Sequence, residues 1–222
     1  MNTPMQNTVP HAQQTALASN KVLRNTYLLL SMTLLFSAVT AGVSMALNLR
    51  YPGIVITLVG YFGLLFLTTK FRNSNAGIVC VFALTGFMGY TLGPILNAYM
   101  SLTNGAETIM MAMGATGTIF IGLSTYVRFT RKDFSFMGGF LMVGILVAFL
   151  AALGALFLDV PNLSLAVSAM FVLLMAGLIL FQTSAIINGG ETNYIMATVT
   201  LYVALFNLFT SLLHMLGIMG DD

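Results

Sequence analysis

Residues 194–217, YIMATVTLYVALFNLFTSLLHMLG, form an uncharged and mostly apolar run that decides the fold class. A helix needs roughly 20 mostly apolar residues to cross a bilayer, and this run is long enough. From the residue just before this run onward, small or polar residues recur at alternating steps of four and three, which keeps them on one helix face. This stripe consists of Asn193, Ala197, Thr200, Ala204, Asn207, Ser211 and His214.

A polar stripe on a membrane helix should face protein or a water-filled crevice rather than lipid. We therefore expect span 194–217 to lie at the centre of a bundle. The large residues off the stripe are Leu201, Leu205, Leu208 and Leu212. Two interpretations of the stripe stay open: a close-packing seam with a few interhelical hydrogen bonds, or a solvated pathway.

The composition extends this interpretation to the whole chain. Of its 222 residues, 58% are apolar and 6% are charged, whereas a soluble domain carries about 25% charged residues. A buried all-helical soluble protein would need polar helix faces, for which there are too few charges. The charges divide the chain into intervals that predict an all-α integral membrane protein, a seven-transmembrane-helix bundle. The expected spans lie near 26–47, 54–69, 76–99, 108–127, 135–158, 162–184 and 194–217.

Basic residues set the expected orientation. One set of inter-span segments holds Lys21, Arg24, Lys70, Arg72, Arg128, Arg131 and Lys132, and the opposite set holds only Arg50. Lys and Arg are retained on the cytoplasmic side during insertion, so we expect a cytoplasmic N-terminus and a periplasmic C-terminus. There is no further basic patch, and no nucleic-acid partner is expected.

Residues 1–20 are rich in Asn, Gln, Thr and Ala and have few large apolar groups. Such a segment cannot bury enough surface to fold alone, which predicts a flexible cytoplasmic tail ahead of one membrane domain, residues 21–222. The tail has no apolar core of a signal peptide, so no cleavage is expected. Cys80 is the one cysteine and excludes an intramolecular disulfide.

No catalytic or metal-binding constellation is visible. The two histidines, His11 and His214, are far apart, and a single cysteine cannot complete a metal set with them. Ser124, in GLSTY, lacks the Gly-x-Ser-Gly surroundings of an intramembrane serine protease. The expected spans contain no Asp, Glu, Lys or Arg. We therefore expect a protein that is not an enzyme and has no cofactor.

Span 76–99 contains the string TGFMGYTLGPIL at residues 85–96. Pro94 has no backbone N–H and crowds the carbonyl of Tyr90, so a kink is expected there. The glycines around it thin the helix. Two interpretations stay open: a hinge, or a site of tight helix packing.

Three ordered strings together resemble the Bax inhibitor-1 family, in its bacterial YccA-like branch: GYTLGPIL at 89–96, FQTSAIINGGETNYI at 181–195 and LYVALFNLF at 201–209. The resemblance extends from Lys21 to the end of the chain. The family signature Gly-x-x-Leu-Gly-Pro-x-Leu falls on Gly89, Leu92, Gly93, Pro94 and Leu96. It implies a seven-helix fold in which the last span is surrounded by the other six.

The resemblance implies one function as an ion leak. Some family members are pH-sensitive calcium leak channels that use two facing aspartates, which share a proton because both cannot cheaply ionise together. These positions fall on Gln182 and Ala204 here, and neither side chain can titrate. A calcium or cation leak without this switch is the alternative function, with calcium as a permeant species rather than a cofactor.

The function expected for the YccA-like branch is binding and modulation of FtsH, a membrane-anchored ATP-dependent protease of the bacterial inner membrane. The tail could be engaged by the ATPase ring, while tightly packed spans would resist extraction. The cytoplasmic hinge Gly189, Gly190 and Glu191 is expected to turn the chain rather than conduct. The Glu191 carboxylate is expected either to stabilise the last helix through its dipole, since it lies near the N-terminus of that helix, or to face a partner.

Overall fold

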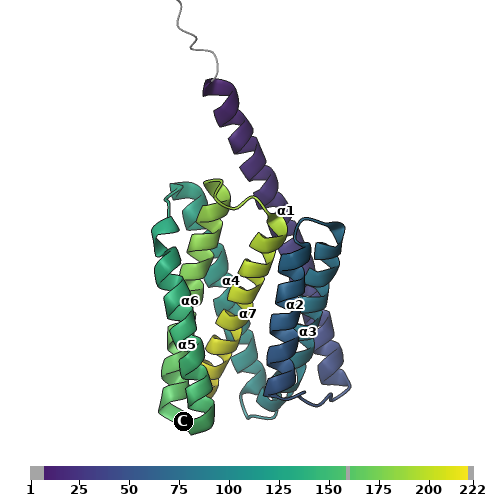
Figure 1. Ribbon diagram of the computed structural model, residues 1–222. Coiled ribbons are helices and arrows are strands. Elements are labelled where there is room, and N and C mark those ends of the chain that lie inside the picture. Colours follow the sequence, from purple (N-terminus) through teal and green to yellow (C-terminus); the bar gives the residue numbers. More distant parts are fainter. Residues whose placement is uncertain (1–7, 159–160, 220–222) are drawn as a thin grey trace, which may run out of the picture.

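The computed structural model in Figure 1 describes residues 8–158 and 161–219, and these form seven α-helices and one short 3-10 helix, η1. The elements are α1 (Thr8–Ala46), α2 (Ile54–Phe71), α3 (Asn75–Met100), α4 (Gly105–Thr130), η1 (Ser135–Met137), α5 (Gly138–Leu158), α6 (Pro161–Ile187) and α7 (Tyr194–Met219). All seven α-helices of the described ranges are long and apolar enough to cross a bilayer. The prediction of an all-helical protein with seven spans is confirmed.

The first helix begins well before the expected first span. Residues 8–20, which we assigned to the tail, are helical and continuous with α1, and Figure 1 shows α1 extending beyond the other helices at one end. Residues 1–7 lie outside the described ranges. The composition of the segment indicated that it has no core of its own, but not that a neighbouring helix would propagate through it.

The fourth helix also extends beyond its uncharged interval, from Gly105 to Thr130 rather than over 108–127. It includes Glu107 in its first turn and Arg128 in its last turn. An acid near a helix N-terminus and a base near its C-terminus both stabilise the helix dipole. The charges that bounded the expected span therefore lie inside the helix rather than at its ends.

Helix α7 packs on α6, α4, α1 and α3, whereas α5 packs mainly on α6, and α2 on α3. Figure 1 shows α7 crossing between the α5–α6 pair and the α2–α3 pair. Two stripe residues, Ala197 and Ala204, have no exposed surface, and neither have Leu201 and Leu208 from outside the stripe. Both faces of α7 are thus buried between Ala197 and Leu208, so the leucines off the stripe in this part pack against protein.

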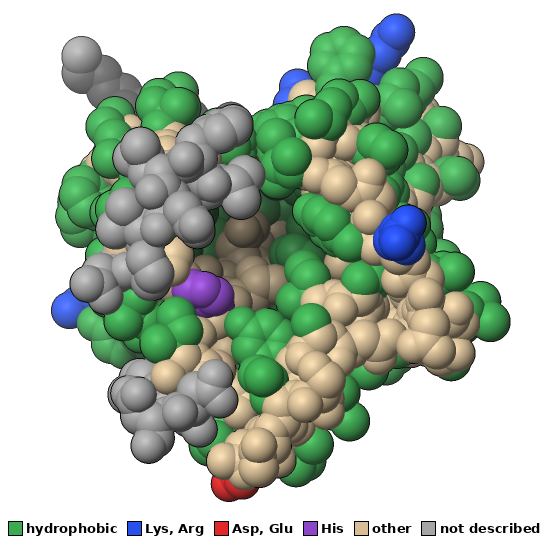
Figure 2. Space-filling model, turned by 90° about the horizontal axis from the view of Figure 1, so that it is seen from below, with side chains coloured by type: hydrophobic (Ala, Val, Ile, Leu, Met, Phe, Trp, Pro, Cys, Tyr) green, Lys and Arg blue, Asp and Glu red, His purple; other side chains and the backbone are tan. Residues whose placement is uncertain are grey.

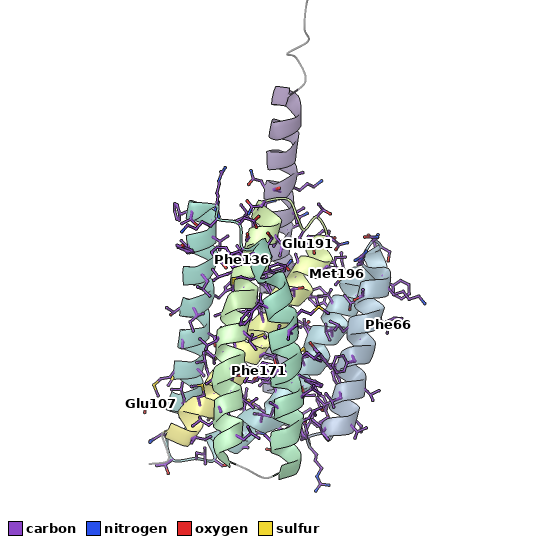
Figure 3. All side chains as sticks on the ribbon, turned by 60° about the vertical axis from the view of Figure 1, so that its left-hand side comes forward. Phe66, Glu107, Phe136, Phe171, Glu191 and Met196 are labelled. Carbon is purple, nitrogen blue, oxygen red and sulfur yellow. The ribbon has the colours of Figure 1, made fainter. Side chains whose placement is uncertain are left out.

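The two ends of the bundle differ in charge. The α6–α7 loop lies beside the α2–α3 loop, since Asn193 donates hydrogen bonds to groups of Arg72 and Asn73. Ser184 connects the segment after α4 to the same end. Figure 3 shows Glu191 at this end and Glu107 at the opposite one. The loops that contain most of the basic residues therefore meet at one end of the bundle.

Candidate functional site

The stripe begins with Asn193, which caps α7. Its side-chain Oδ1 accepts hydrogen bonds from the backbone N–H groups of Ile195 at 3.0 Å and Met196 at 3.1 Å. Its Nδ2 donates to the Arg72 carbonyl at 3.0 Å and to Asn73 Oδ1 at 2.9 Å. An N-cap asparagine stabilises a helix by about 1 kcal/mol. This stripe member thus starts α7 and ties it to the α2–α3 loop.

The hinge before Asn193 is a hydrogen-bonded turn. Gly189 has φ 78°, a left-handed conformation that glycine adopts without a steric penalty at a helix C-terminus. The N–H of Glu191 donates to the Ala185 carbonyl at 3.0 Å, and its Oε1 accepts from the Asn193 N–H at 2.7 Å. Gly190 is exposed. The Glu191 carboxylate therefore braces the residue that caps α7.

The two positions at which the resemblance places the family switch are both buried. Gln182 is 5% exposed, and its Nε2 has no hydrogen-bond partner among the described residues, while Ala204 is fully buried. At 1.5 Å per residue, Gln182 lies about 8 Å from the end of α6 and Ala204 about 15 Å from the start of α7. With an amide at one position and a methyl group at the other, this pair has no proton to share.

Tyr202 on α7 is a buried residue whose hydroxyl is hydrogen-bonded to two other helices, and it is not a member of the polar stripe. Its hydroxyl lies 2.6 Å from Ser37 Oγ and donates to the Thr85 carbonyl at 3.3 Å, and the side chain is 1% exposed. The contact joins α7 to α1 and α3. The sequence did contain an indication of this contact, because the hydroxyl of a tyrosine buried inside a span needs a hydrogen-bond partner.

The part of the stripe from Asn207 to His214 lines a cavity of about 440 Å³ between α5, α6 and α7. Asn207, Ser211 and His214 all contribute to its wall, and His214 Nδ1 lies 3.0 Å from Ser168 Oγ. Figure 2 views this end of the molecule and shows the surface hollowed between the helices. Thr200, which precedes this part of the stripe, is half-buried. Ala197 and Ala204 of the stripe are thus fully buried, whereas Asn207, Ser211 and His214 border a cavity.

The signature glycines lie where α1 and α3 approach each other. A Cβ atom at Gly89 would collide with Ser37 and Thr40, and one at Gly93 would lie 2.5 Å from Ser44 Cβ. Helix α3 continues through Pro94 to Met100. The signature leucines, Leu92 and Leu96, line a cavity that Ser37 and Ala41 of α1 also line. These contacts favour the packing interpretation of the string over a hinge.

Ser44 compensates for the proline. The Tyr90 carbonyl would accept a hydrogen bond from the N–H of residue 94, which Pro94 lacks. Ser44 Oγ on α1 donates to that carbonyl at 2.9 Å. Pro94 thus leaves the Tyr90 carbonyl of α3 without its intrahelical donor, and Ser44 of α1 donates in its place. This hydrogen bond joins α1 and α3 in the region where the signature glycines allow the two helices to approach closely.

This arrangement predicts a double-mutant coupling. Ser44→Ala should lower the free energy of unfolding by about 1 kcal/mol, because it leaves the partly buried Tyr90 carbonyl without its partner. In a Pro94→Ala background the new N–H can satisfy Tyr90, and Ser44→Ala should then cost about 0.5 kcal/mol. Unfolding by SDS titration in detergent micelles measures the cycle. Equal costs in both backgrounds would contradict the compensation.

In the ranges that the structure describes, no three His, Cys, Asp or Glu side chains are grouped closely enough to hold a metal ion. Cys80 is a free, half-buried thiol. Ser124 is buried in α4, and its hydroxyl has no hydrogen-bond partner in these ranges. Most of the polar groups described above join helices or line cavities, and Ser168 with His214 is the described contact that places a hydroxyl beside an imidazole.

Seven apolar helices joined by buried hydroxyl and amide contacts define a multi-pass membrane protein. The chain belongs to the Bax inhibitor-1 family: the family model described as "Inhibitor of apoptosis-promoting Bax1" matches residues 19–221. It is 54% identical over 212 residues, 96% of each chain, to the "Modulator of FtsH protease YccA" of Escherichia coli strain K12. It is equally similar to the "Inner membrane protein YccA" of Escherichia coli O6:H1. An uncharacterized protein of Pseudomonas aeruginosa is 56% identical over 90% of each chain.

These comparisons confirm the resemblance to the YccA-like branch of the family. The E. coli K12 relative is named as a modulator of a protease. The matched region starts at residue 19, so the family model leaves out most of the segment that we assigned to the tail.

Proposed function

We propose that this chain is a multi-pass inner-membrane protein that binds and modulates a protease of the FtsH type. The observation that carries the proposal is the 54% identity to the E. coli modulator, which extends over 96% of both chains and so includes every span. The inner-membrane location rests on the second E. coli relative together with the seven apolar helices.

The proposed mechanism is that of a substrate that is seized and then resists extraction. Residues 1–20 act as the tail that the ATPase ring engages, and residues 21–222 form the membrane domain. The projection of α1 beyond the bundle supports this, because it places the segment where a ring could reach it (Figure 1). The α1–α3 contact and the Tyr202 hydrogen bonds supply the resistance. The protease is then occupied and inhibited.

Deletion of residues 2–18 tests this mechanism. The shortened protein should no longer inhibit degradation of a model membrane substrate by the purified protease in proteoliposomes. Because the deletion leaves every helix from Ser19 onward in place, the thermal unfolding midpoint should stay unchanged. The matched control replaces residues 2–18 by an unrelated polar segment of equal length. This variant should restore inhibition if the ATPase ring engages the segment regardless of its sequence. Full inhibition by the deleted protein would overturn the mechanism, and absence of binding by the full-length chain would overturn the proposed function.

We further propose the orientation and the place of α7. The tail and the α2–α3, α4–α5 and α6–α7 loops lie in the cytoplasm, the C-terminus lies in the periplasm, and α7 is the central span. The basic loops at one end support the orientation through the retention of Lys and Arg inside. The contacts of α7 with α1, α3, α4 and α6 and the burial of both its faces between Ala197 and Leu208 support its central place.

Alkaline phosphatase fusions test the orientation, since this enzyme is active only in the periplasm. A fusion after Ile218 should be active, and a fusion after Asn73 should be inactive, with a difference of at least tenfold at equal expression. A fluorescent protein that matures in the cytoplasm should give the reverse pattern at the same two sites. Activity after Asn73 would overturn the proposed orientation.

A cation leak is the function that the structure supports less. The cavity at the outer end of α7 could admit water and ions. However, the positions of the family switch are occupied by Gln182 and Ala204, and the buried Tyr202 side chain joins three helices deeper in the bundle. Protease modulation is therefore the function that the chain supports best.

A further inference from the structure

Two cavities lie along the space between α1 and α4, which are not among the closely packed helix pairs. The first, of about 250 Å³, is closed at its base by α6 and lies at the end of the bundle that bears Arg128. The second, of about 490 Å³, is closed at its base by α7 and extends toward the other end. Phe120 of α4 lines both cavities. The Phe120 ring lies 5.8 Å from the ring of Tyr27 on α1, between the two cavities, and we call the two cavities together the α1–α4 groove.

The Arg128 end of the groove is polar in a way that the fold does not require. Ser124 and Thr183 line the first cavity and are 8% and 1% exposed, and neither hydroxyl has a hydrogen-bond partner among the described residues. A buried hydroxyl without a partner costs about 1–3 kcal/mol. Thr125 and Arg128 line the same cavity. Three residues with hydroxyl groups and one guanidinium thus line a single cavity, where the exposed Arg128 side chain would pair with a ligand that has anionic oxygens.

The deeper part of the groove is apolar and roomy. It is lined on α1 by Leu34 and Ala38 and on α7 by Leu205 and Phe209. Gly117, on the α4 wall, has open space where a Cβ atom would lie, with no atom within 4 Å. The distance along α4 from Arg128 to Gly117 is about 16 Å, close to the depth of one leaflet of a bilayer. The groove thus has the length of an acyl chain.

We propose that the α1–α4 groove binds an anionic phospholipid from the leaflet at the Arg128 end of the bundle. The phosphate accepts hydrogen bonds from Arg128 and from Thr125 on the same helix, and one acyl chain enters the apolar cavity past Tyr27 and Phe120, whose rings separate to admit it. Basic pockets between membrane helices recognise anionic head groups in this way. The site is separate from the proposed tail mechanism and from the switch positions, and it would couple the helix packing to the charge of the membrane.

The chain has no tryptophan, which permits a direct test. Phe120→Trp places a single fluorophore at the junction of the two cavities, where brominated acyl chains quench its emission on contact. The probes are brominated phosphatidylglycerol and brominated phosphatidylcholine with identical chains, added to detergent-solubilised full-length protein. The groove variant is Arg128→Gln. The matched control is Arg72→Gln, which removes one exposed positive charge from the same end of the bundle but not from the groove.

Phosphatidylglycerol should quench the introduced tryptophan at a concentration about tenfold lower than phosphatidylcholine, and Arg128→Gln should remove this preference, as loss of a charge-assisted hydrogen bond predicts. Arg72→Gln should change it less than twofold. Gly117→Leu should weaken quenching by both lipids, because it fills the apolar cavity. Inorganic phosphate at millimolar concentration should not compete.

Equal quenching by the two lipids in the parent protein would overturn the proposal and indicate only annular lipid. Equal effects of Arg72→Gln and Arg128→Gln would also overturn it, as would displacement by inorganic phosphate, which would indicate a free-anion site. Native mass spectrometry of the chain with Phe120 retained and of its Arg128→Gln variant, with the same two lipids, gives the same comparison if Phe120→Trp does not fold.

Discussion

Gly89→Ala is expected to lower the free energy of unfolding of the membrane domain by about 3 kcal/mol, the upper part of the range for overpacking a tight contact. The added Cβ atom would collide with the Ser37 backbone carbonyl as well as with the Thr40 and Ser37 side-chain oxygens. A flexible side chain could rotate away, but a helix carbonyl can move only if α1 and α3 separate. Their separation would also break the Ser44 hydrogen bond to Tyr90.

The control for this prediction is Gly42→Ala on α1. A Cβ atom there meets no atom within 4 Å, so the substitution keeps the chemical change and removes the clash. Alanine is also the better helix former in water, and Gly42→Ala should change the stability by less than about 1 kcal/mol. SDS titration of both variants in detergent micelles measures the difference. Similar stabilities for the two variants would show that α1 and α3 are not held together at this point.

The number of spans could be predicted from the sequence because charges are costly in lipid and interrupt the apolar runs between helices. The helix ends could not be predicted in the same way. Glu107 and Arg128 lie inside α4 because each has the sign that the nearby helix end favours, and α1 extends through residues with no apolar pattern. Apolar runs locate where lipid can surround a helix, whereas backbone hydrogen bonding decides where the helix ends.

The candidate site was predicted in part. The period of the stripe predicted that Ala197 and Ala204 would face protein, and both are fully buried. The partners of the polar residues could not be predicted, because they are distant in the sequence: Tyr202 meets Ser37 across 165 residues. A single sequence contains no information on such a contact beyond the need of a buried hydroxyl for some partner. The same applies to Ser184, which bonds to residues 132 and 134.

Tyr202→Ala is the second substitution with a large expected effect. The side chain is 1% exposed, and removal of a buried aromatic side chain typically costs about 3–5 kcal/mol. Tyr202→Phe keeps the ring and removes only the hydroxyl, so it should cost about 1–2 kcal/mol. Tyr51 is exposed, and Tyr51→Ala should cost less than about 0.5 kcal/mol. A cost of Tyr202→Phe as large as that of Tyr202→Ala would mean that the hydrogen bonds, rather than the packing, hold α7.

The Ser37 bond can be separated from the rest by a second cycle. In a Ser37→Ala background the partner at 2.6 Å is already absent, so Tyr202→Phe should cost less than it does in the parent protein. A cell-based measurement links this to the proposed function. If the bundle modulates the protease by resisting extraction, Tyr202→Ala should be degraded several times faster than Tyr51→Ala in cells that contain the protease, and at the same rate in cells that lack it. A destabilised Tyr202→Ala variant that persists and still inhibits the protease would mean that inhibition depends on binding alone and not on resistance to unfolding.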